Sequence, residues 1–106
     1  MIARIWHGYT THANADSYEQ LLKTEVFPGI EAKNVSGFKS IQLLRRSLQD
    51  EVEFITIMQF TSIDDIKAFS GDDYEKAYVP AKARAILSRF DGFAQHYEIE
   101  EYRVYG

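Results

Sequence analysis

The sequence predicts an α+β domain with a four-stranded antiparallel sheet, and three observations support this prediction. Four segments alternate apolar and polar residues with the period of two that is typical of a β-strand: 2–9, 37–47, 53–60 and 93–105. Three segments place apolar residues at helical spacing: 13–26, 62–70 and 80–90. The resulting order, β-α-β-β-α-α-β, is that of a split βαβ, ferredoxin-like sandwich.

Capping residues and apolar spacing predict the first helix. The run THANADS at 11–17 is rich in residues that cap helices. Tyr18, Leu22 and Val26 then recur at helical spacing. Pro28, which is followed by a glycine, is expected to break or bend the helix.

Turn and capping signals separate the later elements. The polar residues 48–51 join two strand-like runs, which indicates an antiparallel hairpin. Ser62 is expected to cap the second helix and Gly71 to end it. Pro80 suits the first turn of a third helix, and the Asp-Gly pair at 91–92 suits the turn into the last strand.

Length and composition define the class of protein. The 106 residues predict a single domain, 1–106. A net charge of -4 argues against a nucleic-acid partner, because phosphates require a basic surface. No apolar run approaches the roughly 20 residues that span a bilayer, so no membrane partner is expected. The absence of cysteine excludes disulfides and cysteine-based metal sites and favours a cytoplasmic location.

The predicted sheet is apolar on both faces. With helices on one face only, the other face of such a sheet should be polar. The first strand instead has Ile2 and Trp6 on one side and Ala3, Ile5 and Tyr9 on the other. A second copy packed sheet against sheet would cover the extra apolar face, so the sequence predicts a homodimer. Trp6 is expected to anchor that interface.

Several stretches of the chain are similar to a known family. They are IARIWHG, LLRR, EFITIMQF, SIDDIKAFSGDDYEKA and HYEI, which together extend over residues 2–100. With them the chain resembles the antibiotic biosynthesis monooxygenase-like family. The resemblance implies a dimeric α+β barrel with a pocket in each protomer, between sheet and helices. Family members include cofactor-independent quinone-forming oxygenases, haem-degrading enzymes and proteins of no known activity.

The resemblance also assigns positions in the pocket. It places the pocket residue of the first strand at His7 and the aromatic that packs on the ligand at Phe69. The position of the axial haem histidine falls on Tyr78, and haem-degrading members carry tryptophan where Phe69 stands. These two departures argue against haem, and we expect no cofactor. Three isolated histidines with no common spacing also predict no metal site.

The expected activity is monooxygenation of a small aromatic or phenolic compound without a cofactor. His7 would accept the substrate proton, and alternation would put it on the helix side of the sheet with Tyr9 beside it. The alternative for His7 is a structural bond to a neighbouring strand or to the dimer partner. The other expected substrate-binding residues are Phe69, Tyr74, Tyr78 and His96.

Two other functions stay open at this point. One is a non-catalytic dimer that binds an aromatic metabolite or serves a stress response, and the other is haem binding. On the opposite face of the sheet, Arg4 is expected to pair across the dimer interface with Glu98 or Glu100.

Overall fold

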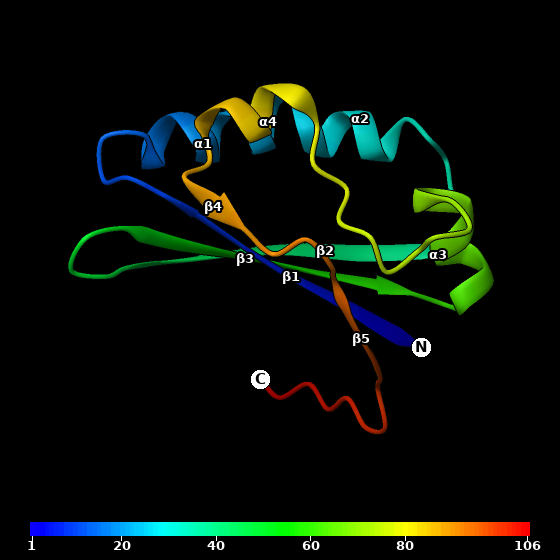
Figure 1. Cartoon of the computed structure of the whole chain (residues 1–106). Helices are drawn as coiled ribbons and strands as arrows, with labels where there is room; N and C mark the ends of the chain where they lie inside the picture. The colour runs from blue at the N-terminus through cyan, green and yellow to red at the C-terminus, as the bar shows by residue number, and fades with distance from the viewer.

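The chain forms one antiparallel sheet with its helices on one face (Figure 1). The computed structural model describes all 106 residues. The strands are β1 (Ile2–Thr10), β2 (Phe38–Ser47), β3 (Val52–Phe60), β4 (Arg89–Phe90) and β5 (Gln95–Glu98). Their order is β2-β3-β1-β4, and β5 also pairs with β1. Because β4 and β5 share one edge of β1, they are two pieces of a single strand position, and the predicted ferredoxin-like arrangement is confirmed.

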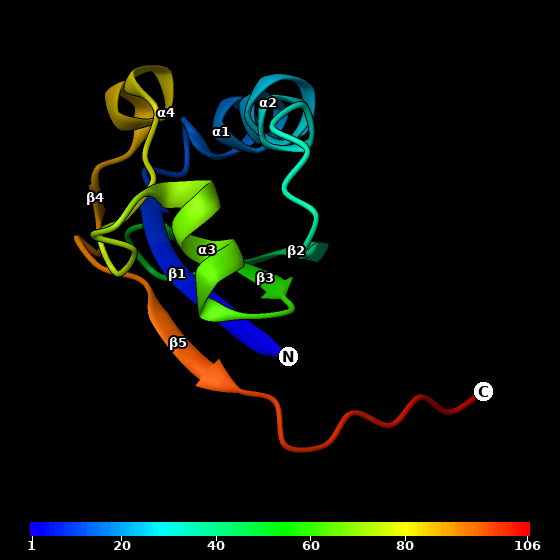
Figure 2. The ribbon, with the colours of Figure 1, turned by 90° about the vertical axis from the view of Figure 1, so that its right-hand side faces the viewer.

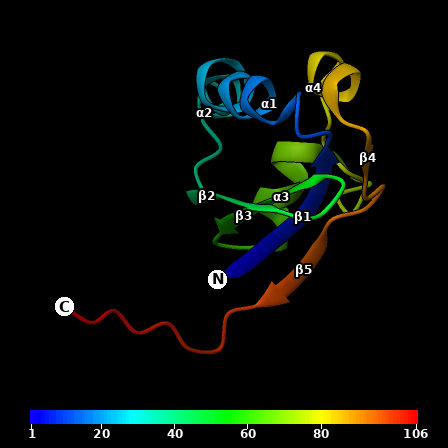
Figure 3. The ribbon, with the colours of Figure 1, turned by 90° about the vertical axis from the view of Figure 1, so that its left-hand side faces the viewer.

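The helices form a layer above the sheet (Figure 2 and Figure 3). They are α1 (Ala15–Leu21), the π-helical segment η1 (Leu22–Val26), α2 (Phe27–Glu31), α3 (Ile63–Ser70) and α4 (Ala81–Ile86). The first three follow one another directly, so the predicted first helix runs on to Glu31. Pro28 does not stop it, because at the first turn of α2 the missing N–H is not needed.

The predicted boundaries of α3 are confirmed. The Oγ of Ser62 accepts a hydrogen bond from the backbone N–H of Asp65 at 3.2 Å. Gly71 ends the helix with φ +94, a value that side chains disfavour.

The prediction was wrong near the C-terminus, where the third helix and the last strand are both shorter than expected. Helix α4 ends at Ile86, because the backbone N–H of Ser88 already donates to the carbonyl of Tyr9 on β1. The last strand position is filled only by 89–90 and 95–98, and residues 99–106 extend on the side opposite the helices (Figure 1). No helix is long and apolar enough to cross a membrane.

Strand β1 faces the helices with the opposite set of side chains from the one we expected. Trp6 packs into the core beneath the helices, and a Cβ added at Gly8 would lie 2.7 Å from its ring. Arg4 points to the same side, whereas His7 and Tyr9 contact Glu53 on the other. The expected placement of His7 and Tyr9 on the helix side and of Arg4 and Trp6 on the dimer side was therefore wrong.

The two faces of the sheet are distinct. The helix side carries the core, which includes Tyr18, Phe54, Met58, Phe60 and Phe69. The other side, here called the open face, has no layer over it (Figure 2). By contacts and strand alternation the open face includes Ala3, Ile5, His7, Tyr9, Leu44, Arg46, Glu53, Ile55 and Ile57, together with the more polar Ser40, Gln42, Gln59, Gln95 and Tyr97.

Candidate functional site

Two small adjoining cavities lie between the sheet and the helices. Their volumes are about 40 and 30 Å³, and both are lined by Trp6, Thr56, Met58 and Tyr78. We call the two together the inner pocket. Its remaining lining comes from both layers: Arg4, Tyr18, Leu22, Val26, Phe27, Phe69, Val79, Pro80 and Ala83. Leu22 and Val26 belong to the π-helical segment η1, and such segments occur frequently at functional sites.

Tyr78 lies between the inner pocket and the outer surface. It also lines a more open cavity of about 280 Å³ on the outside, together with Val26 and Pro80. Its ring packs on Phe69 with 5.0 Å between centroids, and the ammonium of Lys33 lies 4.3 Å from the ring centroid. The same ammonium lies 4.9 Å from the Phe69 ring and donates to the Phe69 carbonyl at 3.1 Å.

Arg4 is the charged group at the base of the inner pocket. Its side chain is buried and forms no ion pair with a carboxylate, which is uncommon for a buried arginine. One terminal nitrogen donates to the carbonyl of Tyr74 and to Nε2 of His96, and the other to the carbonyl of Lys76. Burial lowers the pKa of Arg4 to about 10, so the guanidinium stays protonated at neutral pH.

His96 is held as a neutral imidazole. A guanidinium can only donate, so Nε2 of His96 accepts the 2.9 Å bond from Arg4 and the ring proton lies on Nδ1. Burial, and then the charge of Arg4, lower the pKa of His96 to about 4. With its only free electron pair engaged, His96 cannot accept a substrate proton while this bond exists.

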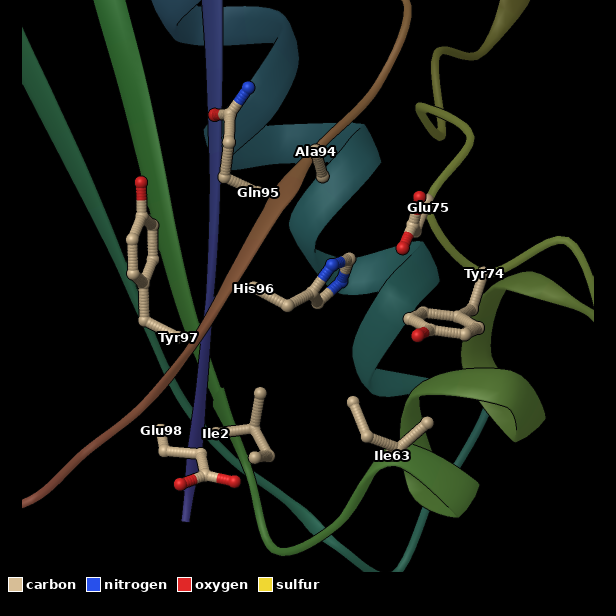
Figure 4. A pocket seen from close by; sticks show the side chains of 9 residues that line it. All are labelled: Ile2, Ile63, Tyr74, Glu75, Ala94, Gln95, His96, Tyr97 and Glu98. Atoms are coloured by element: carbon tan, nitrogen blue, oxygen red, sulfur yellow. The ribbon is translucent and has the colours of Figure 1, made fainter.

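His96 and Tyr74 line a second, open pocket at the edge of the sheet (Figure 4). This edge pocket has a volume of about 510 Å³. The His96 ring points from β5 toward Tyr74 and Glu75, and Ile2 and Ile63 lie at the lower end of the pocket (Figure 4). The rings of His96 and Tyr74 meet edge to face with 5.2 Å between centroids.

The expected site residues thus divide between the inner pocket, the edge pocket beside it and the open face. Phe69 and Tyr78 line or close the inner pocket, and Tyr74 and His96 bind Arg4 beside it. Arg4 and Trp6 were not predicted as pocket residues. The sequence feature that indicates the position of Trp6 is Gly8, two residues further along the strand. A glycine there leaves room for a large ring on the same face of the strand.

His7 and Tyr9 belong to a hydrogen-bonded cluster on the open face. Nδ1 of His7 lies 3.0 Å from the Glu53 carboxylate, and the Tyr9 hydroxyl donates to the same oxygen at 3.3 Å. Nε of Arg46 donates to the other oxygen at 2.6 Å. The hydrogen bond with His7, and then that from Arg46, lower the pKa of Glu53. The cluster satisfies its own charges and lies across the sheet from the inner pocket.

No group of three or more histidine, cysteine, aspartate or glutamate side chains lies close enough to hold a metal ion.

The comparisons with known proteins are structural. No family model and no curated protein matches the chain. Its structure matches a provisionally named antibiotic biosynthesis monooxygenase from Bacillus cereus, with a TM-score of 0.66 and 9% identity over 98% of this chain and 97% of that chain. The chain has the fold of the antibiotic biosynthesis monooxygenases.

Two further structures extend this match. One is SnoaB, a cofactor-independent oxygenase from Streptomyces nogalater, with a TM-score of 0.56 and 18% identity over 95% of both chains. The other is an arginine-to-serine variant of MhuD with two manganese protoporphyrin IX molecules bound in each active site. It has a TM-score of 0.64 and 19% identity over the whole of both chains.

The residues of the inner pocket do not fit a haem. Its two cavities measure about 40 and 30 Å³ with Tyr78 in place. No histidine lines them, and the nearest imidazole, His96, already receives the bond from Arg4. Haem iron is held by a histidine imidazole in globins and peroxidases, and the lining of this pocket provides none.

Proposed function

We propose that this chain is an oxygenase that needs no cofactor and acts on a small aromatic compound in the inner pocket. The observation that carries the proposal is Arg4, a buried cation without a carboxylate partner, next to Phe69 and Tyr78. The fold shared with SnoaB supports the reaction class.

Arg4 stabilises the substrate as an anion. A phenol, or a ring CH₂ conjugated with a carbonyl, ionises more readily when its developing negative charge lies beside a guanidinium in a site that excludes water. No side chain of the inner pocket is a free base, because His96 is bonded through Nε2 and His7 lies on the open face. The substrate proton therefore leaves to solvent as the anion binds.

The bound anion then reacts with dioxygen. For a ring CH₂, ionisation removes one hydrogen as a proton and leaves an electron pair on carbon. Dioxygen takes up this pair by stepwise electron transfer and forms a carbon–oxygen bond, which gives a peroxide after protonation. Loss of the second hydrogen together with hydroxide, as water, leaves a carbonyl. The carbon loses four electrons and dioxygen gains four, so no external reductant is required.

The aromatic walls keep water from the intermediate. Trp6 forms part of the lining, and its Nε1 donates to the Asp91 carbonyl at 2.7 Å. Phe69 and Tyr78 close the side toward the connector between α3 and α4. Exclusion of water strengthens the interaction of Arg4 with the anion and limits side reactions of the peroxide.

Oxygen uptake tests the proposal. The purified protein, incubated with anthrone in air-saturated buffer, should consume one dioxygen for each anthraquinone formed and faster than buffer alone. A metal chelator should leave the rate unchanged. If the protein binds anthrone and oxygen uptake stays at the background rate, the chain is a binding protein and the oxygenase proposal fails.

We also propose that two copies pair through the open face. Ile5, Ile55 and Ile57 form an apolar strip on it, and Leu44 is 43% exposed. Side chains of this kind without a covering layer mark an interaction surface. Glu53 is buried near the hairpin end of this face, where Arg46 balances its charge and His7 contacts its carboxylate, and this permits close packing. Light scattering should give twice the chain mass of 12.3 kDa.

A further inference from the structure

We propose that Tyr78 is the gate of the inner pocket and that the pocket selects aromatic rings bearing a negative charge. The inference relies on the proposed function only for the location of the site. It names the residue that controls access and the chemical class of the ligand.

The cavities meet at Tyr78. Its side chain lines both parts of the inner pocket and the outer cavity of about 280 Å³. The inner parts, of about 40 and 30 Å³, admit no aromatic ring while Tyr78 lies between them and the outside. With the Tyr78 ring turned out, the three spaces join into a volume within the range of about 300–1,000 Å³ that small-molecule sites occupy.

Turning Tyr78 out breaks no hydrogen bond of its side chain. The hydroxyl makes none, and the side chain is 39% exposed. Residues 77–80 belong to no helix or strand. The connector is attached independently, since the backbone N–H of Ala77 donates to Gly92 and the carbonyls of Tyr74 and Lys76 bind Arg4. A rotamer change of an exposed side chain takes picoseconds to nanoseconds.

The ring of Tyr78 occupies a place suited to a ligand ring. It packs on Phe69 at 5.0 Å and lies beneath the ammonium of Lys33 at 4.3 Å. An aromatic ligand that displaces it keeps both contacts, the stacking on Phe69 and the cation above its face.

The charges around this place favour an anion. The guanidinium of Arg4 lies 5.6 Å from the Phe69 ring centroid, and the ammonium of Lys33 lies 4.9 Å from the same centroid. Neither forms an ion pair, although the chain carries 16 acidic residues against 12 basic ones. Arg4 and Lys33 therefore place two positive charges, neither paired with a carboxylate, beside the Phe69 ring. A negatively charged ligand bound there would neutralise them.

A pair of probes that differ only in charge tests the selectivity. Naphthalene carboxylate and naphthalene carboxamide have nearly the same size, and Trp6 is the only tryptophan of the chain. Its single indole N–H signal in a nitrogen–proton correlation spectrum therefore reports binding at the inner pocket. The carboxylate should shift this signal and bind at least about tenfold more tightly than the carboxamide, as expected of a charged hydrogen bond.

Variants test the two parts of the proposal. Tyr78→Ala should tighten binding of the carboxylate about tenfold, if the gate is open roughly 10% of the time. Tyr102→Ala, on the exposed C-terminal segment, is the control and should leave this affinity unchanged.

The charge selectivity is tested by removing each cation. Lys33→Met should lower the preference for the carboxylate several-fold. Lys39→Met removes another exposed lysine without an ion pair and should leave the preference unchanged. Arg4→Gln, which can still donate to the connector carbonyls, should abolish the preference.

The outcomes are distinct. An unshifted indole signal, equal affinity for the two probes, or weaker binding to Tyr78→Ala would each overturn the inference. Because these titrations involve no turnover, selective binding without oxygen uptake would contradict the oxygenase proposal and leave the gate and its selectivity standing.

Discussion

The two faces of strand β1 carry similar side chains in opposite electrostatic settings. On the helix side, the charge of Arg4 is met only by backbone carbonyls and a neutral imidazole, that of His96. On the open face, His7 and Arg46 surround the carboxylate of Glu53. A cation that retains its charge inside a pocket is available to a ligand, whereas a balanced cluster is suited to burial in an interface. This electrostatic difference is the basis on which we propose a binding role for the helix side and an assembly role for the open face.

The largest expected effect comes from comparing Arg4 with His7 in the oxygen-uptake assay. Arg4→Gln should lower the rate with anthrone by about 10²–10³, the usual loss when a group that stabilises a developing anion is removed. His7→Asn should keep most of the activity, because the side chain lies on the open face. Circular dichroism serves as the folding control for both variants. A reversed order of the two effects would return the chemistry to His7.

A charge on the open face should disrupt assembly without altering the pocket. Ile57 lies half-buried on β3, and Ile57→Asp would place an unpaired carboxylate within the interface. We expect dimer affinity to fall by about 100-fold or more, measured by sedimentation at micromolar concentration. Ala68→Asp, on the exposed surface of α3, is the matched control and should remain dimeric. A native protein that sediments as a monomer of 12.3 kDa would refute the pairing.

The smallest expected effect is a dependence of stability on pH that arises at His96. Its pKa is about 4 in the folded chain and 6.5 in the unfolded chain, so between these values the unfolded chain binds more protons. The free energy of unfolding therefore falls as the pH is lowered from 6.5 to about 4. Because the ring is partly exposed, we expect a loss of roughly 1–2 kcal/mol.

Urea unfolding at several pH values measures this loss. His96→Gln keeps an acceptor for Arg4 and has no proton to gain, so its stability should vary less over the same interval. His12→Gln, at an exposed position, should behave like the native chain. Parallel curves for native protein and His96→Gln would show that His96 does not govern this interval.

The elements that local chemistry specifies were the ones predicted correctly. Ser62 and Gly71 bound α3 as expected, because a side-chain cap and a positive φ depend on single residues. The helix expected up to residue 90 ended at Ile86, because bonds to β1 compete for residues beyond it. Four of the residues expected at the candidate site lie around Arg4, namely Phe69, Tyr74, Tyr78 and His96. The other two, His7 and Tyr9, lie on the open face.

By itself, the sequence determined the kinds and order of the elements, and the alternation that separates Arg4 and Trp6 from His7 and Tyr9. Periodicity depends only on neighbouring residues and is visible in the chain. Only the tertiary structure decided which of the two sets faces the helices. That choice depends on pairings between distant residues, such as Trp6 opposite Thr56 and Arg4 opposite both Met58 and His96. A shift of one residue in those pairings exchanges the two faces of a strand, so no local pattern can reveal which face lines the pocket.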